Sequence, residues 1–412
     1  MIIPSIDLIS GKAVQLRQGK ELKLVDDRCP IALATEFNRY GEVAVIDLDA
    51  ALSKGDNLEL IRKLCRVADV RAGGGIRDIE RARILLRAGA KQIIVGTAAT
   101  PEFLSQLPKS RVLVALDCDA NGIVLDKGWT DSTGETVIDR AKRLAPYCGG
   151  FLCTFVAQEG TMQGLPIDQV KRLQAEIDLP LTVAGGVATT EEASAIARLG
   201  VDVQVGMALY TGKLKLAESV INSLDFDKQS LIPTIVQDVA GEVLMLAYSS
   251  KESLMLALEE GRGIYFSRSR NEIWRKGETS GNRQTLLSCR TDCDRDALLF
   301  TVSQNGPACH TQAYSCFGSG VRSPRFSMPA LMETLRQRQA DAPENSYSAK
   351  LFAKRPMLLK KIMEEAYEVV SAPDRDNLVW EIADTLYFMS VLATAEGVEW
   401  QEVVDELGGR VK

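Results

Sequence analysis

The chain has 412 residues, more than one ordinary domain needs, and its 46% hydrophobic and 25% charged residues are typical of a globular protein. The net charge of −6 argues against a general nucleic-acid or membrane-surface binder, although it does not exclude a local site for a small anion. No apolar run looks long enough to span a bilayer, and the first residues lack the features of a signal peptide. We therefore expect several domains and a cytoplasmic location.

Cysteine and histidine usage limits the chemistry. Nine cysteines, an odd number, in a chain without a secretion signal argue against a disulfide framework. Most of them are expected to pack as small apolar groups. Because His310 is the only histidine, one chain cannot form a site that needs two imidazoles.

Residues 1–228 alternate apolar strands with helix-length amphipathic stretches, which indicates an α/β fold with a parallel sheet. The strands are VRAGGGI, KQIIVGTA, RVLVALD, FLCTFVA, LPLTVAGGV and VDVQVGMAL. Eight strand–helix units fit this length, so we predict a TIM (β/α)8 barrel. The alternative is a doubly wound open sheet.

An internal repeat favours the barrel. Asp7 and Asp117 each end an apolar strand, 110 positions apart, and Val95-Gly96 and Val205-Gly206 have the same offset. Gly74-Gly75 and Gly185-Gly186 are 111 positions apart. Features in register over half of the segment indicate a duplicated half-barrel.

The repeat predicts an active site at the carboxyl ends of the barrel strands. Asp7 and Asp117 would lie on opposite sides of one mouth, where such a pair can act as general acid and general base. The glycine-rich strand ends would form two phosphate cradles of backbone amides, Gly74, Gly75, Gly96 and Thr97 in one and Gly185, Gly186, Gly206 and Met207 in the other. Two cradles suggest a substrate with a phosphate at each end.

Several segments of this region resemble the ribotide isomerase of histidine biosynthesis, which opens a ribose by an Amadori rearrangement. They are IIPSIDLISGKAVQL, VIDLDAA, GGGIR, VGTAA, Lys127-Gly-Trp129, AGGV and VGMALY. The family's loop after strand six usually reads TDxxRDGT, whereas residues 154–161 read TFVAQEGT, so that Glu159 replaces an aspartate. The resemblance implies an isomerase, and the alternative is a barrel that only serves as a scaffold.

A second domain is predicted over residues 229–340, small, mainly β and of the α+β class. Its short strands LIPTIVQD, EVLMLAY, GIYFSRS, TLLSCRTD and ALLFTVS have an antiparallel character. The polar stretch from Gly318 to about Asn345 contains three prolines and reads as a connection.

Two sets of candidate metal ligands lie in this domain. Asp292, Asp294 and Asp296 alternate, which places three carboxylates on one face, as oxygen-binding magnesium prefers. Three thiolates suit zinc and leave a fourth position for a water that ionises near neutral pH; the candidates are Cys293, Cys309 and Cys316. The alternative is three buried cysteines beside a solvated acidic loop.

The middle domain also resembles a known family. The segments GEVLMLAY, YFSRSRNEIWRKGETSG, DCDRDALL and GPACHTQAYSCF are similar to phosphoribosyl-AMP cyclohydrolase, although Asn282 stands where that family has histidine. The resemblance implies Zn2+ on the three cysteines, Mg2+ on the three aspartates, and a homodimer whose zinc ligands come from both chains. His310 could shuttle a proton or make only a structural hydrogen bond. The substrate phosphate could be held by Arg268, Arg270, Arg275 and Lys276.

The remaining residues, 341–412, predict an all-α domain with two helices separated by residues 372–377. On these helices five acidic residues share faces at i, i+3 or i+4 spacing and could bind Mg2+: Glu364, Glu365, Glu368, Glu381 and Asp384. Exposed helices often carry such glutamates without a metal.

SYSAKLF, KKIMEEAYEVV and EIADTLYF resemble phosphoribosyl-ATP pyrophosphohydrolase, although Phe388 stands where that family often has histidine. The resemblance implies magnesium-dependent release of pyrophosphate, whose nucleotide product is the cyclohydrolase substrate. We expect small phosphorylated nucleotides as ligands, with no nucleic acid or membrane partner. The alternatives are a bifunctional enzyme with an inactive barrel, or a non-catalytic metal-binding regulatory subunit.

Overall fold

The computed structural model describes residues 1–126, 128–318, 327–341, 346–398 and 400–408. Two compact units divide the chain, Met1–Arg322 and Ser323–Lys412. The first contains a barrel and a strand-rich region, and the second is helical. Lys127, from the Lys127–Trp129 motif, lies outside the described residues.

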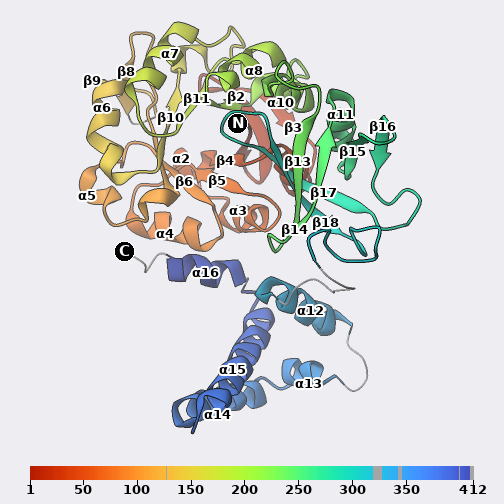
Figure 1. Cartoon of the computed structure of the whole chain (residues 1–412). Helices are drawn as coiled ribbons and strands as arrows, with labels where there is room; N and C mark the ends of the chain where they lie inside the picture. Colours follow the sequence, from red (N-terminus) through yellow and green to blue (C-terminus); the bar gives the residue numbers. More distant parts are fainter. Residues whose placement is uncertain (127, 319–326, 342–345, 399, 409–412) are drawn as a thin grey trace. The chain divides into compact units, whose positions relative to one another are not determined.

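Parallel strands close into a barrel, because the last strand pairs with the first (Figure 1). In barrel order the described strands are β1 (Ile2–Ile9), β4 (Val43–Asp47), β5 (Val70–Gly73), β6 (Gln92–Val95), β7 (Val112–Ala115), β10 (Gly150–Thr154), β11 (Leu181–Ala184) and β12 (Asp202–Val205). Most of their residues are buried, as expected for parallel strands covered on both faces. The predicted TIM barrel is confirmed, and the open sheet is excluded.

Helices surround the barrel. They are α1 (Pro30–Phe37), α2 (Leu48–Ala51), α3 (Leu58–Cys65), α4 (Ile79–Arg87), α5 (Pro101–Leu104), α6 (Val137–Leu144), α7 (Ile167–Glu176), α8 (Thr190–Arg198), α9 (Met207–Tyr210) and α10 (Leu216–Ser223), with 3-10 turns η1 (Asn38–Tyr40), η2 (Lys109–Arg111), η3 (Ala145–Tyr147) and η4 (Val156–Gln158). The Asp78 side chain caps α4 and the Thr189 side chain caps α8, each accepting from the backbone N–H three residues on. These matched caps, 111 positions apart, agree with the predicted repeat.

Two hairpins extend from the barrel strands. β2 (Lys12–Arg17) pairs antiparallel with β1 and with β3 (Glu21–Asp26). β8 (Ile123–Asp126) pairs with β9 (Asp131–Thr136) after β7. The backbone N–H of Gln18, in the β2–β3 turn, donates to the Glu159 carbonyl at 3.0 Å, which ties this hairpin to the loop after β10.

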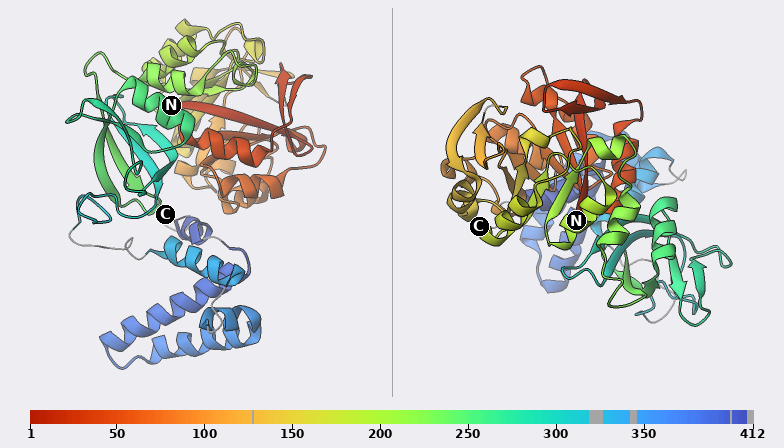
Figure 2. Two further views of the ribbon diagram at one scale, coloured as in Figure 1. Left: turned by 90° about the vertical axis from the view of Figure 1, so that its right-hand side faces the viewer. Right: turned by 90° about the horizontal axis from the view of Figure 1, so that it is seen from above.

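The strand-rich region forms a sheet in the order β14-β13-β18-β17. Its elements are β13 (Ile232–Asp238), β14 (Val243–Ser249), α11 (Lys251–Glu260), the hairpin β15 (Ile264–Ser267) and β16 (Glu272–Arg275), β17 (Gln284–Thr291) and β18 (Leu298–Gln304). The antiparallel expectation was wrong for one pair, because β13 and β18 run parallel. This sheet lies beside the barrel (Figure 2), and both contribute to one continuous hydrophobic core.

The second unit contains α12 (Met328–Ala340), α13 (Tyr347–Ala353), α14 (Arg355–Ser371), α15 (Arg375–Ala395) and α16 (Trp400–Gly408). The predicted break between two long helices is confirmed. The expected connection at residues 318–345 was wrong over α12, because Pro329 stands in the first turn, where proline is tolerated, and Ser327 caps the helix. A small core joins α12 to the helices that follow, through Leu335, Leu351, Leu358, Phe388 and Val391.

One described helix, α15, is long and apolar enough to cross a membrane by length and composition alone. The expectation that no apolar run has this length was therefore wrong. The helix packs against α14 and α12, and its partly buried Glu381 and Asp384 suit a helical bundle. The cytoplasmic location stays a prediction.

Candidate active sites

Three carboxyl groups gather at the barrel mouth. Asp7, on β1, accepts a hydrogen bond from Ser5 Oγ at 2.7 Å, and Asp117, two residues after β7, accepts one from Trp129 Nε1 at 2.8 Å. Glu159, in the loop after β10, lies near enough to both for their charges to act on it. All three side chains are only partly exposed. The predicted pair is therefore joined by a third acid.

Burial changes how these acids hold protons. It raises the pKa of Asp7 to about 6, against the opposing hydrogen bond from Ser5. Burial, reinforced by the charges of Asp7 and Asp117, raises the pKa of Glu159 to about 8. The pKa of Asp117 is also raised by burial, although Trp129 and Thr154 oppose the shift. At neutral pH Glu159 therefore keeps its proton whereas Asp7 is largely ionised, and an acid beside a base at one mouth is suited to acid–base chemistry.

The raised pKa of Glu159 predicts that the stability of the protein depends on pH. The pKa of this carboxyl is about 8 in the folded protein, whereas its ordinary value is 4.5. Between pH 4.5 and pH 8 the group is therefore protonated in the folded protein and ionised in the unfolded chain. The protein therefore loses stability as the pH rises through that window. We expect Glu159→Gln to raise the free energy of unfolding at pH 8.5 by ~1–2 kcal/mol, less than the full shift because the group keeps some solvent contact, and to give no gain at pH 4.5.

Thermal unfolding at the two pH values measures this effect. Glu176→Gln is the matched control, because Glu176 lies on the barrel surface and pairs with Lys142 at 2.7 Å. An equal gain from Glu159→Gln at both pH values would contradict the assignment of a raised pKa.

The predicted cradle glycines follow neighbouring strands. Gly74-Gly75 and Gly96-Thr97 follow β5 and β6, and Gly185-Gly186 and Gly206-Met207 follow β11 and β12. A Cβ on Gly74 would approach the Asp47 carbonyl oxygen to 2.2 Å, and one on Gly185 would approach the Phe155 carbonyl oxygen to 2.5 Å. Close packing alone therefore requires glycine at these two turns, whatever they bind.

Two of the predicted zinc ligands lie together. Cys309 and Cys316 belong to one loop, held by a hydrogen bond from the Cys316 N–H to the Leu244 carbonyl on β14 at 2.7 Å, and the two thiols lie close enough for each to shift the pKa of the other. The Thr311 hydroxyl, donating to Cys309 Sγ at 3.1 Å, lowers the pKa of that thiol. His310 Nδ1 lies 3.8 Å from the same sulfur, on an exposed side chain.

Cys293 lies elsewhere in the chain. It follows β17, one edge of the sheet, whereas Cys316 lies along β14, the other edge. Three strand spacings of ~4.8 Å separate these edges by ~14 Å. Thiolates that share one zinc ion each lie ~2.3 Å from it. Within one chain the structure therefore does not bring Cys293 to the other two cysteines.

The three aspartates do meet. Asp292, Asp294 and Asp296 each offer a carboxylate oxygen within 4.8 Å of the others, on a turn between β17 and β18. Asp292 Oδ1 also accepts from the N–H groups of Asp296 and Ala297, both at 3.1 Å. Such clustered carboxylates repel one another unless a cation or solvent compensates.

A pocket of about 540 Å³ lies between β14 and the β15–β16 hairpin. Arg268 lines it, with its guanidinium 3.7 Å from the centre of the Tyr248 ring. Lys276 lies beside the thiols, with Nζ donating to the Ala308 carbonyl at 2.7 Å, and burial lowers its pKa while the thiols oppose that shift.

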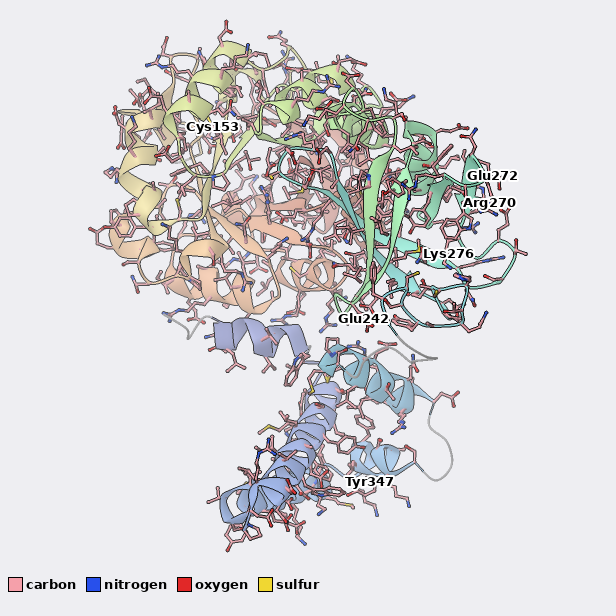
Figure 3. All side chains as sticks on the ribbon, viewed as in Figure 1. Cys153, Glu242, Arg270, Glu272, Lys276 and Tyr347 are labelled. Carbon is pink, nitrogen blue, oxygen red and sulfur yellow. The ribbon has the colours of Figure 1, made fainter. Side chains whose placement is uncertain are left out.

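The other two predicted phosphate ligands have acidic partners. Arg270 pairs with Glu272 at 3.2 Å, and Arg275 pairs with Glu260 at 2.6 Å. Figure 3 labels Arg270 and Glu272. Arg268 and Lys276 are thus better placed than Arg270 and Arg275 to meet an anion.

In the helical unit, three of the five predicted acids come together. Glu365 and Glu368 on α14 and Glu381 on α15 each place a carboxylate oxygen within 4.8 Å of the others. Burial and the neighbouring Glu368 carboxylate raise the pKa of Glu381. Asp384 adds charge close to Glu381, whereas Glu364 pairs with Lys360 and Lys361 at 3.2 and 3.1 Å.

Comparison with known protein families identifies the three regions in order. Residues 1–215 match the family described as histidine biosynthesis protein, residues 245–318 phosphoribosyl-AMP cyclohydrolase, and residues 328–410 phosphoribosyl-ATP pyrophosphohydrolase. Both hydrolase families are metal-dependent in general.

Curated relatives agree. The histidine biosynthesis bifunctional protein HisIE of Pyrococcus furiosus is 42% identical over 206 residues, covering 47% of this chain and 99% of the relative. The HisIE protein of Bacillus subtilis is 44% identical over 199 residues, covering 46% and 95%. The histidine biosynthesis trifunctional protein of Kluyveromyces lactis is 46% identical over 188 residues, 45% of this chain but only 23% of that longer relative.

The barrel, the thiol and carboxylate sets and the helical acids all lie in the regions that these families match. The chain belongs to the histidine biosynthesis family, in which it joins an isomerase-type barrel to a phosphoribosyl-AMP cyclohydrolase and a phosphoribosyl-ATP pyrophosphohydrolase.

Proposed function

We propose that the chain carries out three consecutive steps in the reverse of their order along the sequence. The helical unit releases pyrophosphate from phosphoribosyl-ATP, the cyclohydrolase opens the adenine ring of phosphoribosyl-AMP, and the barrel isomerises the product. The observation that carries this proposal is that each matched region has its own clustered set of ionisable groups. The domain limits 1–228, 229–340 and 341–412 remain part of this proposal.

The cyclohydrolase site is proposed to form between two copies of the chain. Cys309 and Cys316 from one copy and Cys293 from the other supply three sulfur ligands, a donor set that suits Zn2+. The open sheet face exposes apolar side chains that a second copy would cover, among them the paired residues Leu246 and Ile235, with 52% and 41% of their surface exposed. A homodimer both joins the ligands and buries this face.

Once bound, zinc supplies a water that is acidic enough to act near neutral pH. The residues of the chain then have separate roles. Arg268 holds the substrate phosphate at the pocket, Lys276 keeps positive charge beside the thiolates, and His310 moves a proton at its exposed ring.

Magnesium is proposed at two carboxylate clusters, because hard divalent cations prefer oxygen ligands. One cluster is Asp292, Asp294 and Asp296. The other is Glu365, Glu368 and Glu381, with Asp384 and Glu364 beside it. The second cluster would neutralise the phosphate charge from which pyrophosphate departs.

The barrel is proposed to act as an isomerase. The Amadori rearrangement needs a proton on the ribose ring oxygen and the removal of another from carbon. A protonated Glu159 beside Asp7 and Asp117 provides both an acid and bases at one mouth. The glycine turns after the neighbouring strands would hold the two phosphates.

One reaction tests all three steps. Purified protein with Mg2+ and Zn2+ is given phosphoribosyl-ATP, and pyrophosphate, ring-opened product and isomerised product are followed by chromatography. We expect all three to form, and we expect Asp7→Asn to slow only the last by ~10²–10⁴-fold. Chelation should stop the hydrolytic steps. An intact ring in metal-replete protein would favour a regulatory subunit, and ring opening without isomerisation in the wild type would favour a scaffold barrel.

A further inference from the structure

The three aspartates lie on one turn, residues 292–296, the carboxylate loop. It closes the β17–β18 hairpin, and the Asp292 N–H donates to the Ala297 carbonyl at 3.1 Å. Arg295 adopts the left-handed backbone conformation, with φ of 65°, which is uncommon for a residue with a long side chain. The loop thus combines an unfavourable backbone with mutual repulsion of carboxylates, and its shape needs outside support.

Residues 225–229, which follow the last barrel helix α10, supply that support. The Asp225 N–H donates to the Arg295 carbonyl at 3.0 Å, and Gln229 Nε2 donates to the Asp296 carbonyl at 2.8 Å. Lys228 Nζ lies 3.8 Å from the Asp296 carboxylate. Two successive carbonyls of the loop are therefore fixed by the segment that joins the barrel to the cyclohydrolase.

The loop also reaches the barrel through a side chain. Arg295 is partly buried and lies near enough to the Asp202 carboxylate, at the start of β12, for the two charges to interact. Asp202 also binds the Met1 amino group at 2.5 Å and Arg71 at 3.1 Å. Arg295 thus lies close to a charged group that the barrel itself holds in place.

A separate set of contacts fixes the strand that leads into the loop. Arg290, near the end of β17, forms an ion pair with Asp69 of the barrel. Asn38 Nδ2 donates to the Leu287 carbonyl of β17 at 3.2 Å, and Asn38 Oδ1 accepts from the Asp69 N–H at 2.8 Å. Both the strand and the loop after it are held by the barrel of the same chain.

We infer that the barrel has a structural role in the neighbouring reaction: together with the segment that joins it to the cyclohydrolase, it positions the carboxylate loop for its divalent cation, with Gln229 of that segment as a positioning residue. The inference rests on the magnesium site proposed for this loop. A loop already held in its binding geometry spends less of its binding free energy on ordering, so the cation binds more tightly. This role holds whether or not the barrel is itself an active isomerase.

Binding of Mn2+, a paramagnetic substitute for Mg2+, measures the effect without relying on turnover. The full chain carries Glu368→Gln and Glu381→Gln, so that the helical cluster does not compete, and Asp294→Asn in this parent identifies the signal of the loop. We expect Gln229→Ala to weaken Mn2+ binding at the loop by about 5- to 20-fold, as loss of a supporting hydrogen bond around a metal site commonly does. Excess Mg2+ should restore cyclohydrolase kcat.

Two variants control for unrelated damage. Gln92→Ala removes a similar hydrogen bond, from the Gln92 side-chain amide to the Ser110 carbonyl at 3.1 Å. Neither residue contacts the carboxylate loop in the bonds described above. Arg39→Ala removes two bonds from the barrel to the Leu258 and Glu259 carbonyls of α11, which loosens the same interface away from the loop. Both should bind Mn2+ like the parent.

The possible results distinguish the positioning role of Gln229 from the magnesium site itself. Unchanged Mn2+ affinity in Gln229→Ala, or an equal loss in Arg39→Ala, overturns the positioning role and leaves the magnesium site intact. A parent whose Mn2+ binding is unaffected by Asp294→Asn overturns the magnesium site and the inference with it.

Discussion

Replacement of Cys309 by serine is expected to remove zinc from the cyclohydrolase and to slow ring opening by roughly 10³-fold or more, because the metal-bound water is lost as the nucleophile source. A serine hydroxyl does not ionise at neutral pH, whereas the Thr311 hydrogen bond already lowers the pKa of the Cys309 thiol. Pyrophosphate release should be unchanged, since its acids lie in the other unit. Metal analysis and the two separate assays measure these effects.

Cys29→Ser is the control, because Cys29 is a solvent-accessible thiol that lies in the barrel before α1. It should keep zinc and both hydrolytic activities. Full zinc content together with normal ring opening in Cys309→Ser would show that this thiol is not a ligand.

Neutralising one acid of the helical cluster is expected to have a comparably large effect on pyrophosphate release. We expect Glu381→Gln to reduce pyrophosphate release by ~10²–10⁴-fold, as loss of a metal ligand removes charge stabilisation of the departing phosphate. Glu381 shares the cluster with Glu365 and Glu368, and burial with the nearby Glu368 charge raises its pKa. Ring opening of supplied phosphoribosyl-AMP should continue at the wild-type rate.

Glu396→Gln at the end of the same helix is the control, because Glu396 pairs with Arg355 at 3.0 Å and lies outside the cluster. Circular dichroism should show both variants to be helical. Equal pyrophosphate release by Glu381→Gln and Glu396→Gln would show that the helical cluster does not take part in the reaction.

The barrel could be predicted because its signal is local. Buried parallel strands read as short apolar runs, and the repeat places equivalent strand ends 110 or 111 positions apart. Pairing partners in the second domain are not local. Nothing in the residues of β13 and β18 indicates that these strands, far apart in the sequence, run parallel.

Helix α12 was missed for a different reason. Pro324, Pro329 and Pro343 suggested a connection, but a proline in the first turn of a helix costs nothing, because its missing N–H would have no helical partner there. Ser327, three positions before the Ala330 N–H that it caps, was the available signal.

In the candidate sites, too, groupings of residues that are close in the sequence could be predicted, and groupings of distant residues could not. Alternation along a strand end predicted that Asp292, Asp294 and Asp296 share one face; the three carboxylates do lie together, but on a turn after β17 and not on a strand. Spacing could not place Glu159 between two acids from other strands, although the altered loop sequence drew notice to that residue. The pairs of Glu364 with Lys360 and Lys361 do follow from helical i, i+4 and i, i+3 spacing, and Lys361 also pairs with Glu365 at 3.0 Å.

The proposed zinc site requires cysteines at opposite edges of one sheet to meet across two copies of the chain. Cys293→Ser and Cys309→Ser proteins, each inactive in ring opening, are unfolded together, refolded as a mixture and assayed on phosphoribosyl-AMP. Half of the dimers would combine both variants, and each of these would contain one complete set of three sulfurs, so about a quarter of wild-type activity should return. A mixture that forms mixed dimers but stays inactive would contradict a shared zinc site.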